Sequence, residues 1–404
     1  MKVLILSHRV PYPPNKGEKL RTYHQIKHFT NSGHNVCVCT PVVSEDDLNN
    51  AVLLEKTLNI SVKYAKPVNH ALRLIKGLLF FKPLSVSNFY CTGLQKRLDY
   101  TIKNDHYDAI LCTSSSMAEY IFKSTTLPSY RANNRLTLIM DFMDLDSDKW
   151  RQYSCSSRWP MSWVYKRENR LLSNYELRVQ QAFDHCFFIS QNEVDLFHKL
   201  TGPTDNVRVL GNGIDTEEFY PATTPPNNTD PVFIFTGVMD YKPNIEAVHW
   251  FVDNAWELIT SKYPHSRFII AGMNPVDSIV SLCDIAGIEI TGFVEDILPY
   301  YHTADYFVAP FTIARGVQNK ILQAFACGLP VITTSMGAEG ISCTNGKDVM
   351  IAQTGNEFLE AIIKLQENSS FKYQITSSAL RLIKDVYSWE GQLKPLDTVL
   401  YNHG

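Results

Sequence analysis

A glycine turn in the second half of the chain carries the residues best suited to hold an anion. An apolar strand, Tyr306 to Pro310, leads towards Gly316, and the helix after this glycine ends at Cys327-Gly328. A second apolar strand follows at Pro330 to Thr333. In a βαβ unit of this kind, ligands bind beside the carboxyl end of the first strand. Because the first N–H groups of a helix have no intrahelical partner, we expect residues 316–319 to cradle a phosphate or another anion.

An acidic cluster in the first half could contact a second substrate. Asp141, Asp144 and Asp146 lie at and after the end of a predicted strand, Leu136 to Phe142. The D-x-D spacing of the last two is also found in nucleotide-sugar enzymes that hold a divalent metal. Those enzymes have a single-domain layout that this chain lacks. We therefore expect no bound metal and favour an acceptor-side or structural role for all three carboxylates.

The loop after the first strand is another place where a substrate could bind. Lys2 to Ser7 has the pattern of a buried strand, and three prolines keep the following loop, residues 8–17, out of a helix. The helix predicted at Glu18 to Asn31 begins next to Gly17. The cations around this turn are Arg9, Lys16, Lys19 and Arg21. We expect anion or acceptor binding here; the alternative is a solvated helix start.

A stretch without acidic residues lies further along the first half. Residues 56–98 contain eight lysines and arginines and no Asp or Glu. Residues 70–81 have helical spacing, with His70, Arg73 and Lys76 on one face. A basic amphipathic helix predicts contact with an anionic membrane surface or a lipid-diphosphate substrate. The alternative is an ordinary surface helix packed on the sheet.

Aromatic and basic residues are mixed between Trp150 and Arg170. Such a mixture can bind nucleic acid, but the net charge of −3 and the alternation of strands and helices favour a sugar or a membrane interface. We expect Trp150 to face the acceptor or the membrane, and we expect no nucleic acid partner.

Length and composition set the broad class of protein. At 404 residues the chain exceeds what one hydrophobic core usually supports, so we expect two domains. Its 45% hydrophobic and 20% charged residues are typical of a soluble globular protein. Nine cysteines without a C-x-x-C pair favour reduced thiols. We therefore expect a cytoplasmic protein that the basic helix could bring to the inner face of the cytoplasmic membrane.

The alternation of strands and helices is interrupted once. Residues 206–230 are rich in proline and polar residues and predict a linker. We expect an N-terminal Rossmann-like domain at residues 1–205 and a C-terminal one at residues 231–386. A final helix at residues 387–404 should pack on the first domain. The predicted fold class is α/β, with two doubly wound parallel sheets facing a cleft that holds the ligands.

Motifs in both halves carry a family resemblance. Those of the second half are NGIDTEEFYP at 212–221, FTGVMDYKPN at 235–244, ITGFVEDILPYYHTADYFVAPF at 290–311 and GVQNKILQAFACGLPVITT at 316–334. They resemble the retaining group 1 (family 4) glycosyltransferases of the GT-B fold. Those of the first half are HRVPYPPNKGEKLR at 8–21, PLSV at 83–86 and DFMDLDSDKWRQYS at 141–154. They resemble a narrower branch, the sugar transferases associated with exosortase/PEP-CTERM exopolysaccharide systems.

The resemblance implies that the second domain binds a nucleotide-diphosphate sugar, that the first binds an acceptor, and that no further cofactor takes part. Gly292, Phe293 and Val294 would approach the base, and Gly17 would approach the diphosphate. Two lysines would be the basic residues that hold the diphosphate, namely Lys242 and Lys320. The other residues expected in the donor site are Gly237, Gly316, Val317 and Gln318.

Two positions depart from the family pattern. The family usually carries two glutamates separated by seven residues, the first contacting the donor sugar and the second the ribose; here these positions are Arg315 and Gln323. A carboxylate accepts two hydrogen bonds from ribose hydroxyls, whereas Gln323 has one acceptor oxygen, so ribose binding should be weaker or differently arranged. Arg315 could hold the diphosphate or an acidic sugar by a bidentate pair.

The predicted function is a metal-independent transfer of a sugar, with retention of anomeric configuration, from a nucleotide-diphosphate sugar to a lipid-linked or polysaccharide acceptor in exopolysaccharide biosynthesis. Lys242, Lys320 and Arg315 would offset the charge of the leaving diphosphate together with the helix N-terminus. Asp144 would orient the acceptor hydroxyl, with His8 as the alternative.

Two other functions stay open. The absence of both glutamates favours a catalytically weak or inactive scaffold protein that binds a sugar nucleotide or a glycan. A sugar-nucleotide epimerase on the same fold would need no acceptor site, and the basic amphipathic helix at residues 70–81 argues against it.

Overall fold

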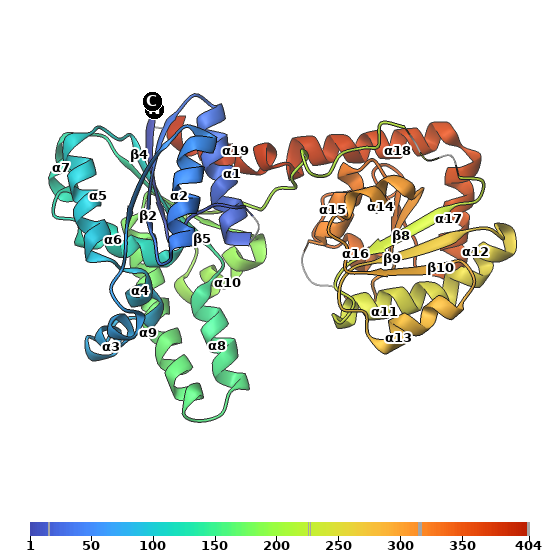
Figure 1. Ribbon diagram of the computed structural model, residues 1–404, viewed down its shortest axis with the longest axis horizontal. Helices are drawn as coiled ribbons and strands as arrows, with labels where there is room; N and C mark the ends of the chain where they lie inside the picture. The colour runs from blue at the N-terminus through green and yellow to red at the C-terminus, as the bar shows by residue number, and fades with distance from the viewer. Residues whose placement is uncertain (15–16, 225, 227, 314–316, 402–404) are drawn as a thin grey trace. The chain divides into compact units, whose positions relative to one another are not determined.

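The computed structural model describes residues 1–14, 17–224, 226, 228–313 and 317–401, without the side chains of Lys76 and Ser156. The chain divides into two compact units (Figure 1). The first contains Met1–Asn212 and Gln392–Gly404, and the second contains Gly213–Gly391. No helix in the described part of the chain has the length and apolar character needed to span a membrane.

A seven-stranded parallel sheet forms the centre of the first unit, in the order β3-β2-β1-β4-β5-β6-β7. The strands are β1 Lys2–Ser7, β2 Asn35–Pro41, β3 Ser61–Ala65, β4 Ala109–Thr113, β5 Thr137–Met143, β6 His185–Phe188 and β7 Val207–Val209. Helices cover both faces, so the inner strands are continuous apolar runs with almost no exposure. The strand order reverses between β1 and β4, and loops after these two strands are the expected ligand positions.

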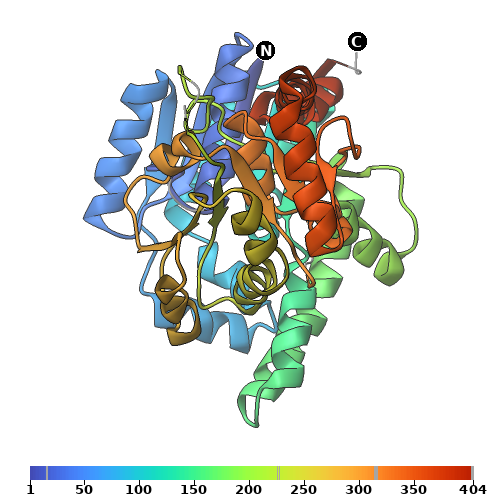
Figure 2. The same cartoon turned by 90° about the vertical axis from the view of Figure 1, so that its right-hand side faces the viewer.

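The helices of the first unit include a long hairpin. They are α1 Gly17–Asn31, α2 Glu45–Leu58, α3 His70–Leu79, α4 Leu84–Phe89, α5 Thr92–Asn104, α6 Ala118–Lys123, α7 Leu127–Asn133, α8 Asp146–Ser156, α9 Met161–Ala182 and α10 Gln191–Thr201. Helices α8 and α9 pack against each other and project from the body of this unit (Figures 1 and 2). The last helix, α19 Trp389–Tyr401, enters the first unit from Gln392 onward, and its Asp397 Oδ1 lies 2.8 Å from His28 Nε2 of α1.

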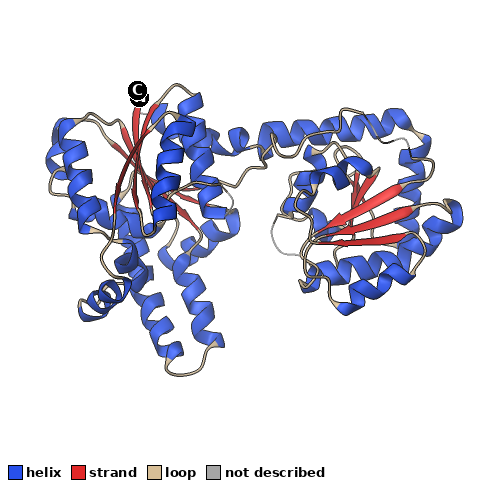
Figure 3. Cartoon of the chain, in the orientation of Figure 1, coloured by secondary structure: helices blue, strands red, loops and turns tan. Residues whose placement is uncertain are grey.

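A six-stranded parallel sheet forms the centre of the second unit, in the order β10-β9-β8-β11-β12-β13. The strands are β8 Val232–Thr236, β9 Arg267–Ala271, β10 Ile288–Gly292, β11 Tyr306–Ala309, β12 Val331–Thr333 and β13 Met350–Ile351. Its helices are α11 Lys242–Phe251, α12 Glu257–Lys262, α13 Asp277–Val280, α14 Leu298–Thr303, α15 Asn319–Ala326, α16 Ser335–Ala338, α17 Gly355–Glu367 and α18 Ser369–Leu382. Here too, helices cover both faces of the sheet (Figure 3). The predicted α/β class with two doubly wound sheets is confirmed.

The helical segment after β8 is not regular throughout. Helices α11 and α12 are separated by a wider π turn, Val252–Trp256. The turn lies against the start of α17, where a Cβ on Gly355 would be 1.8 Å from the carbonyl oxygen of Asn254. Only glycine allows α17 to approach the turn this closely.

Candidate functional site

A pocket of about 450 Å³ lies at the carboxyl edge of the second sheet. Strand order reverses between β8 and β11, so the pocket is at the position where doubly wound sheets bind ligands. The loops after β8, β9 and β10 and the starts of α11 and α15 line it. All lining residues belong to the second unit: Thr236, Gly237, Val238, Tyr241, Asn244, Ala271, Gly272, Met273, Phe293, Val294, Ile297, Gln318, Asn319, Lys320 and Gln323.

Two glycines allow the loops after β8 and β9 to meet at this pocket. Gly272 has a φ of +152°, and a Cβ on it would lie 1.7 Å from the carbonyl oxygen of Gly237. Gly237 has a φ of +155°, and a Cβ there would lie 2.6 Å from both Lys320 Nζ and Asn244 Nδ2. A side chain at either position would displace backbone or the polar groups of the pocket.

Lys320 brings a partly buried amino group to the pocket, and no carboxylate among the described residues pairs with it. Its Nζ donates to Asn244 Oδ1 at 2.6 Å and lies 4.5 Å from the ring centroid of Phe235 and 5.2 Å from that of Phe311. Burial lowers the pKa of Lys320 to about 7. An anionic ligand would supply the missing countercharge and raise this pKa again.

Gln323 lies three residues further along α15, and its acceptor atom already has a partner. Tyr301 Oη donates to Gln323 Oε1 at 3.3 Å, and the same hydroxyl lies 2.8 Å from Thr236 Oγ1. Tyr301 is fully buried, and burial raises its pKa far above the ordinary value, so it stays a donor. A ligand can meet Gln323 through its NH₂ group, as a donor, and through the one lone pair of Oε1 that Tyr301 leaves.

Of the three residues expected to approach the base, two line the pocket and one does not. Phe293 and Val294 line it, and the Phe293 side chain is 68% exposed, which leaves a ring face open to a ligand. Gly292 ends β10 with a φ of +66° and is not part of the pocket wall. Gln318 lines the pocket as the residue before α15, whereas Val317 does not line it.

Lys242, the second lysine predicted for the diphosphate, points into solvent. Its side chain is 79% exposed, and its Nζ lies 3.5 Å from Glu246 Oε1, one turn along α11. The neighbouring Tyr241 lines the pocket, whereas Lys242 does not. Arg315 and Gly316 of the same predicted set lie outside the described residues, as does Lys16 of the first unit.

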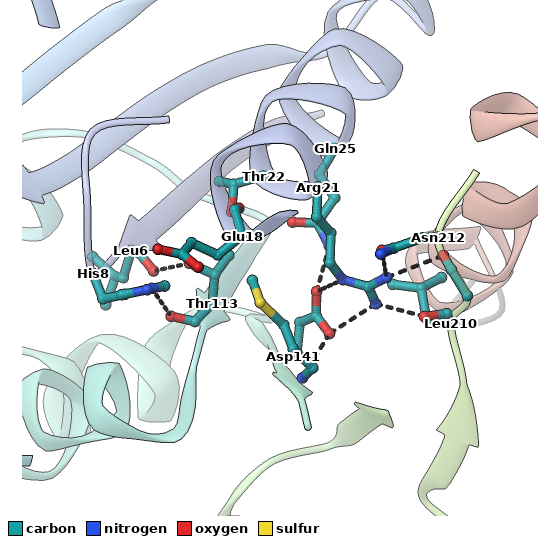
Figure 4. Close-up of polar contacts among 12 residues, drawn as sticks. Leu6, His8, Glu18, Arg21, Thr22, Gln25, Thr113, Asp141, Leu210 and Asn212 are labelled. Carbon is teal, nitrogen blue, oxygen red and sulfur yellow. Dashed lines mark hydrogen bonds and ion pairs between the residues drawn. The ribbon is translucent and has the colours of Figure 1, made fainter. Parts of the chain in front are cut away.

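In the first unit, Arg21 and Asp141 form a buried ion pair (Figure 4). Arg21 donates from Nε and Nη2 to the two oxygens of Asp141, at 2.6 and 2.9 Å. Its other N–H groups donate to Leu210 O at 2.6 Å, Gly211 O at 3.0 Å and Asn212 Oδ1 at 2.9 Å. All five donors of the guanidinium are thus engaged, and the two side chains are 1% and 0% exposed. The prediction that this pair faces an acceptor or a membrane does not hold; it fastens α1 to β5 and to residues 210–212.

His8 follows β1, one of the two strands at which the first sheet reverses its order. Its Nδ1 lies 3.3 Å from Thr113 O, at the end of β4 (Figure 4). Since a carbonyl only accepts, Nδ1 carries the proton and Nε2 is left as an acceptor. The ring meets Phe89 edge to face at 5.2 Å, and burial lowers the pKa of His8 to about 4. The imidazole is therefore neutral at pH 7 and able to accept a hydrogen bond.

The acidic cluster after β5 does not act as one group. Asp144 is exposed in the loop, whereas Asp146 begins α8 and is half-buried. Burial raises the pKa of Asp146 to about 6, and the nearby Asp144 and Glu193 carboxylates add to this effect. Within the described ranges, no group of three or more His, Cys, Asp or Glu side chains is arranged to hold a metal.

Most other residues of the first unit that were predicted to face an acceptor or a membrane contact other side chains of this unit or are partly buried. Arg9 Nη1 pairs with Glu18 Oε1 at 2.9 Å, and Trp150 packs on Tyr165 with ring centroids 5.4 Å apart. The Nε atom of Arg73 is buried, and burial lowers the pKa of this side chain, so it does not face outward. The side chain of Lys76 lies outside the described residues.

Gly17, predicted to approach the diphosphate, is the first residue of α1 and has open space around it. A Cβ there would meet no heavy atom within 4 Å. Sequence reasoning missed three residues of the second-unit pocket that the geometry singles out, namely Asn244, Gly272 and Tyr301. Asn244 ends the motif at 235–244, Tyr301 lies within the motif at 290–311, and Gly272 follows an apolar strand, so all three gave a signal. The role of Tyr301 is visible only in the structure, because it depends on the hydrogen bond to Gln323.

Comparison with known proteins agrees with this arrangement. Residues 230–368 match the family Glycosyl transferases group 1. An uncharacterized 44.6 kDa protein in the cps region of Klebsiella pneumoniae is 23% identical over 398 residues, which is 96% of each chain. A probable sucrose-phosphate synthase of Thermosipho melanesiensis is 26% identical over 210 residues, which is 50% of this chain and 48% of that protein.

Solved structures show the same fold over the whole chain. Anabaena Alr3699/HepE in complex with UDP covers 100% of both chains, with a TM-score of 0.61 and 16% identity. Sucrose-phosphate synthase from Thermosynechococcus elongatus covers 100% of this chain and 99% of its own, with a TM-score of 0.57 and 13% identity. The protein therefore has the GT-B fold. The match to Glycosyl transferases group 1 lies within the second unit, the unit that forms the pocket.

Proposed function

We propose that the protein transfers a sugar from a nucleotide-diphosphate sugar to a lipid-linked or polysaccharide acceptor, with retention of anomeric configuration and without a metal. The observation that carries this proposal is Lys320, whose partly buried amino group lies in a ligand-sized pocket and has no carboxylate partner among the described residues. Burying an ammonium ion without a countercharge costs stability, so such a group is expected where an anionic ligand binds.

The relatives support a nucleotide sugar as the donor. The Anabaena protein has been solved in complex with UDP and with UDP-glucose. The Klebsiella relative lies in a cps region, which favours a role in making an extracellular polysaccharide. In the pocket, the exposed face of Phe293 would stack on the base, and Gln323 would donate to the ribose.

The leaving diphosphate sets the main chemical demand on this site. As the bond between the anomeric carbon and the phosphate oxygen breaks, negative charge develops on that oxygen. The Lys320 ammonium and the N–H groups at the start of α15 would stabilise it, because both lie at the pocket. The acceptor oxygen then bonds to the anomeric carbon on the same face, and its proton passes to the leaving phosphate oxygen.

The acceptor would bind to the first unit, at the carboxyl edge of its sheet. His8 is better suited than Asp144 to accept a hydrogen bond from the acceptor hydroxyl there. Its Nε2 is an acceptor in a neutral, oriented ring, whereas Asp144 lies exposed in the loop after β5. His8→Ala should therefore lower turnover with an acceptor while leaving UDP affinity unchanged.

A donor and turnover screen tests the proposal. The purified protein is incubated with UDP-glucose and other nucleotide sugars, and released UDP is measured with and without membrane lipid extracts or oligosaccharides as acceptors. We expect acceptor-stimulated UDP release that Lys320→Ala reduces by about two orders of magnitude, as the loss of one group that stabilises the developing charge would. Undiminished release by Lys320→Ala would overturn the role of this residue.

A second function has one observation in its favour. Gln323 stands where a carboxylate is expected for ribose, and its single acceptor oxygen already accepts one hydrogen bond, from Tyr301. Without that carboxylate, the protein could bind a sugar nucleotide and not transfer the sugar. Tight UDP-glucose binding without turnover on every acceptor would favour this scaffold over the transferase.

A further inference from the structure

Helix α3 presents its apolar side chains to solvent. Leu72, Ile75 and Leu79 have helical spacing and are 54%, 51% and 70% exposed. Phe80 and Phe81, directly after the helix, are 71% and 78% exposed. An ordinary surface helix buries its apolar stripe against the core. The outward stripe of α3 therefore differs from the surface helix that the sequence offered as the alternative.

The opposite side of α3 faces the protein through polar and small residues. A Cβ on Gly77 would lie 2.7 Å from Ser87 Oγ of α4, so α3 and α4 are in close contact there. The Arg73 side chain is half-buried, with its Nε atom fully enclosed. The helix thus contacts α4 through its glycine and leaves Leu72, Ile75 and Leu79 largely exposed.

The tip of the α8–α9 hairpin exposes a second set of large apolar side chains. Trp159 is 82% exposed, Trp163 is 59% exposed, and Met161 between them is 45% exposed. Two tryptophans this exposed on a projecting tip are unusual for the free surface of a protein. Tryptophan is the residue that concentrates at the boundary between lipid and water.

The two sets belong to one end of the first unit. Arg167 of α9 donates from Nη2 to the carbonyl oxygens of Gly77 and Lys82, both at 3.2 Å, so it fixes the end of α3 to the hairpin. Glu168 accepts from the backbone N–H groups of Leu84 and Ser85 at 2.8 Å. Arg167 is six residues from the start of α9, so the tip extends about 9 Å beyond this junction. Figures 1 and 2 both show α3 and the hairpin tip at the same end of the unit.

The exposed charges around the hairpin tip are mostly positive. Residues 149–170 contain six lysines and arginines and a single acid, Glu168, which is 1% exposed and bonded to the start of α4. Arg151 pairs with Asp148, and Arg167 is bonded to the end of α3. The exposed cations of this segment are Lys149, Arg158, Lys166 and Arg170. Near α3, by contrast, Arg73 is half-buried and Lys82 pairs with Glu119. Large apolar side chains beside exposed cations are complementary to an anionic lipid bilayer. The apolar side chains can enter the boundary of the acyl layer, and the cations can pair with the headgroups.

We propose that this end of the first unit docks on an anionic lipid bilayer. The docking surface consists of Leu72, Ile75, Leu79, Phe80, Phe81, Trp159, Met161 and Trp163. The tryptophans and phenylalanines enter the interfacial layer, and the exposed cations of the hairpin, Lys149, Arg158, Lys166 and Arg170, contact anionic headgroups. The proposal is independent of the sugar transfer proposed above, because the donor pocket is formed by the second unit alone.

Vesicle binding of the full chain tests the proposal. Sedimentation with phosphatidylglycerol-containing vesicles is compared for the wild type and two variants, Trp159→Ser/Trp163→Ser and Leu79→Ser/Phe80→Ser/Phe81→Ser. Each variant should lower the partition coefficient about tenfold or more, since several buried apolar groups are lost. The wild type should also bind pure phosphatidylcholine vesicles more weakly and should release from anionic vesicles at high salt.

A matched control separates this surface from general stickiness. Tyr100→Ser/Tyr373→Ser removes two aromatic side chains that are 71% and 73% exposed elsewhere and should bind vesicles like the wild type. Thermal unfolding and UDP affinity, measured on every variant, show whether the fold and the donor site are intact. Absence of wild-type binding to anionic vesicles, equal loss in the control, or concentration-dependent self-association through the same residues without lipid binding would overturn the proposal.

Discussion

At the scale of single residues, two cations have opposite environments: Arg21 is buried and Lys320 is partly buried. Arg21 donates all five of its N–H groups, two of them to the carboxylate of Asp141. Lys320 donates to one neutral amide, that of Asn244, and otherwise faces aromatic rings. The first arrangement is complete within the protein. The second is complete only when a ligand brings negative charge, which is why we place the donor diphosphate there.

The incomplete environment of Lys320 should be visible in stability. Its pKa is about 7 in the folded protein and 10.5 unperturbed, so between these values the unfolded chain binds more protons. The free energy of unfolding should therefore rise with pH in this window, by up to about 1.4 kcal/mol per pH unit from this group. Lys320→Met removes the effect and should stabilise the protein most below pH 7. Denaturant unfolding at several pH values measures this, with the exposed Lys347→Met as the control; equal slopes in all three proteins would contradict it.

The amide of Gln323 gives a second prediction at this scale. A glutamate there could keep the hydrogen bond from Tyr301 with one oxygen and offer the other to a ribose hydroxyl. Charge-assisted hydrogen bonds are about twice as strong as neutral ones. Gln323→Glu should therefore tighten UDP binding several-fold in calorimetry, whereas Gln353→Glu, outside the pocket, should not. Weaker binding by Gln323→Glu would mean that ribose does not lie beside this residue.

At the scale of elements, backbone contacts between loops form the floor of the pocket. Gly272→Ala would place a Cβ 1.7 Å from the carbonyl oxygen of Gly237, so the loops after β8 and β9 would have to separate. We expect a loss of about 1–3 kcal/mol of stability and weaker UDP binding. Gly346→Ala is the matched control, because this glycine also has a positive φ, +74°, but has open space around its Cβ position. Similar effects of the two substitutions would show that backbone strain at a positive φ, and not the contact between the loops, causes the loss of stability.

The Arg21–Asp141 pair is the corresponding connection in the first unit. Arg21→Leu leaves a buried carboxylate without its partner, which typically costs about 3–5 kcal/mol. The double variant Arg21→Leu/Asp141→Leu should cost less than Arg21→Leu alone, because no unpaired charge remains. Thermal or denaturant unfolding compares the two. An additive or larger loss in the double variant would show that the three bonds to residues 210–212 dominate.

The elements also show what sequence patterns can and cannot predict. Short apolar strands followed by glycine turns predicted both parallel sheets, because such strands repeat with a recognisable local pattern. Arg21 was assigned to a substrate because its partners lie about 120 and 190 positions away in sequence. The orientation of α3 was also beyond the pattern: amphipathic spacing identifies two faces, but only packing against α4 shows which of them is outside.

At the scale of the whole molecule, the two units have separate tasks in this account. Every residue that lines the pocket in which we propose that the donor binds belongs to Gly213–Gly391. If the units unfold separately, calorimetry should show two transitions, and UDP should raise the midpoint of only one of them, since a ligand stabilises the part that binds it. The lipid-docking substitutions should leave that shift unchanged. A shift of both transitions by UDP would show that the units unfold as one.

The central claim is that Lys320 holds the diphosphate of the donor. Titration calorimetry with UDP on the wild type, Lys320→Ala and the exposed control Lys347→Ala tests it most directly. Loss of a hydrogen bond to a charged group should weaken binding about 10- to 100-fold in Lys320→Ala only. Near pH 8 the wild type should also take up a proton on binding, because the ligand raises a pKa of about 7. Equal UDP affinity in all three proteins, with no proton uptake by the wild type, would contradict the account.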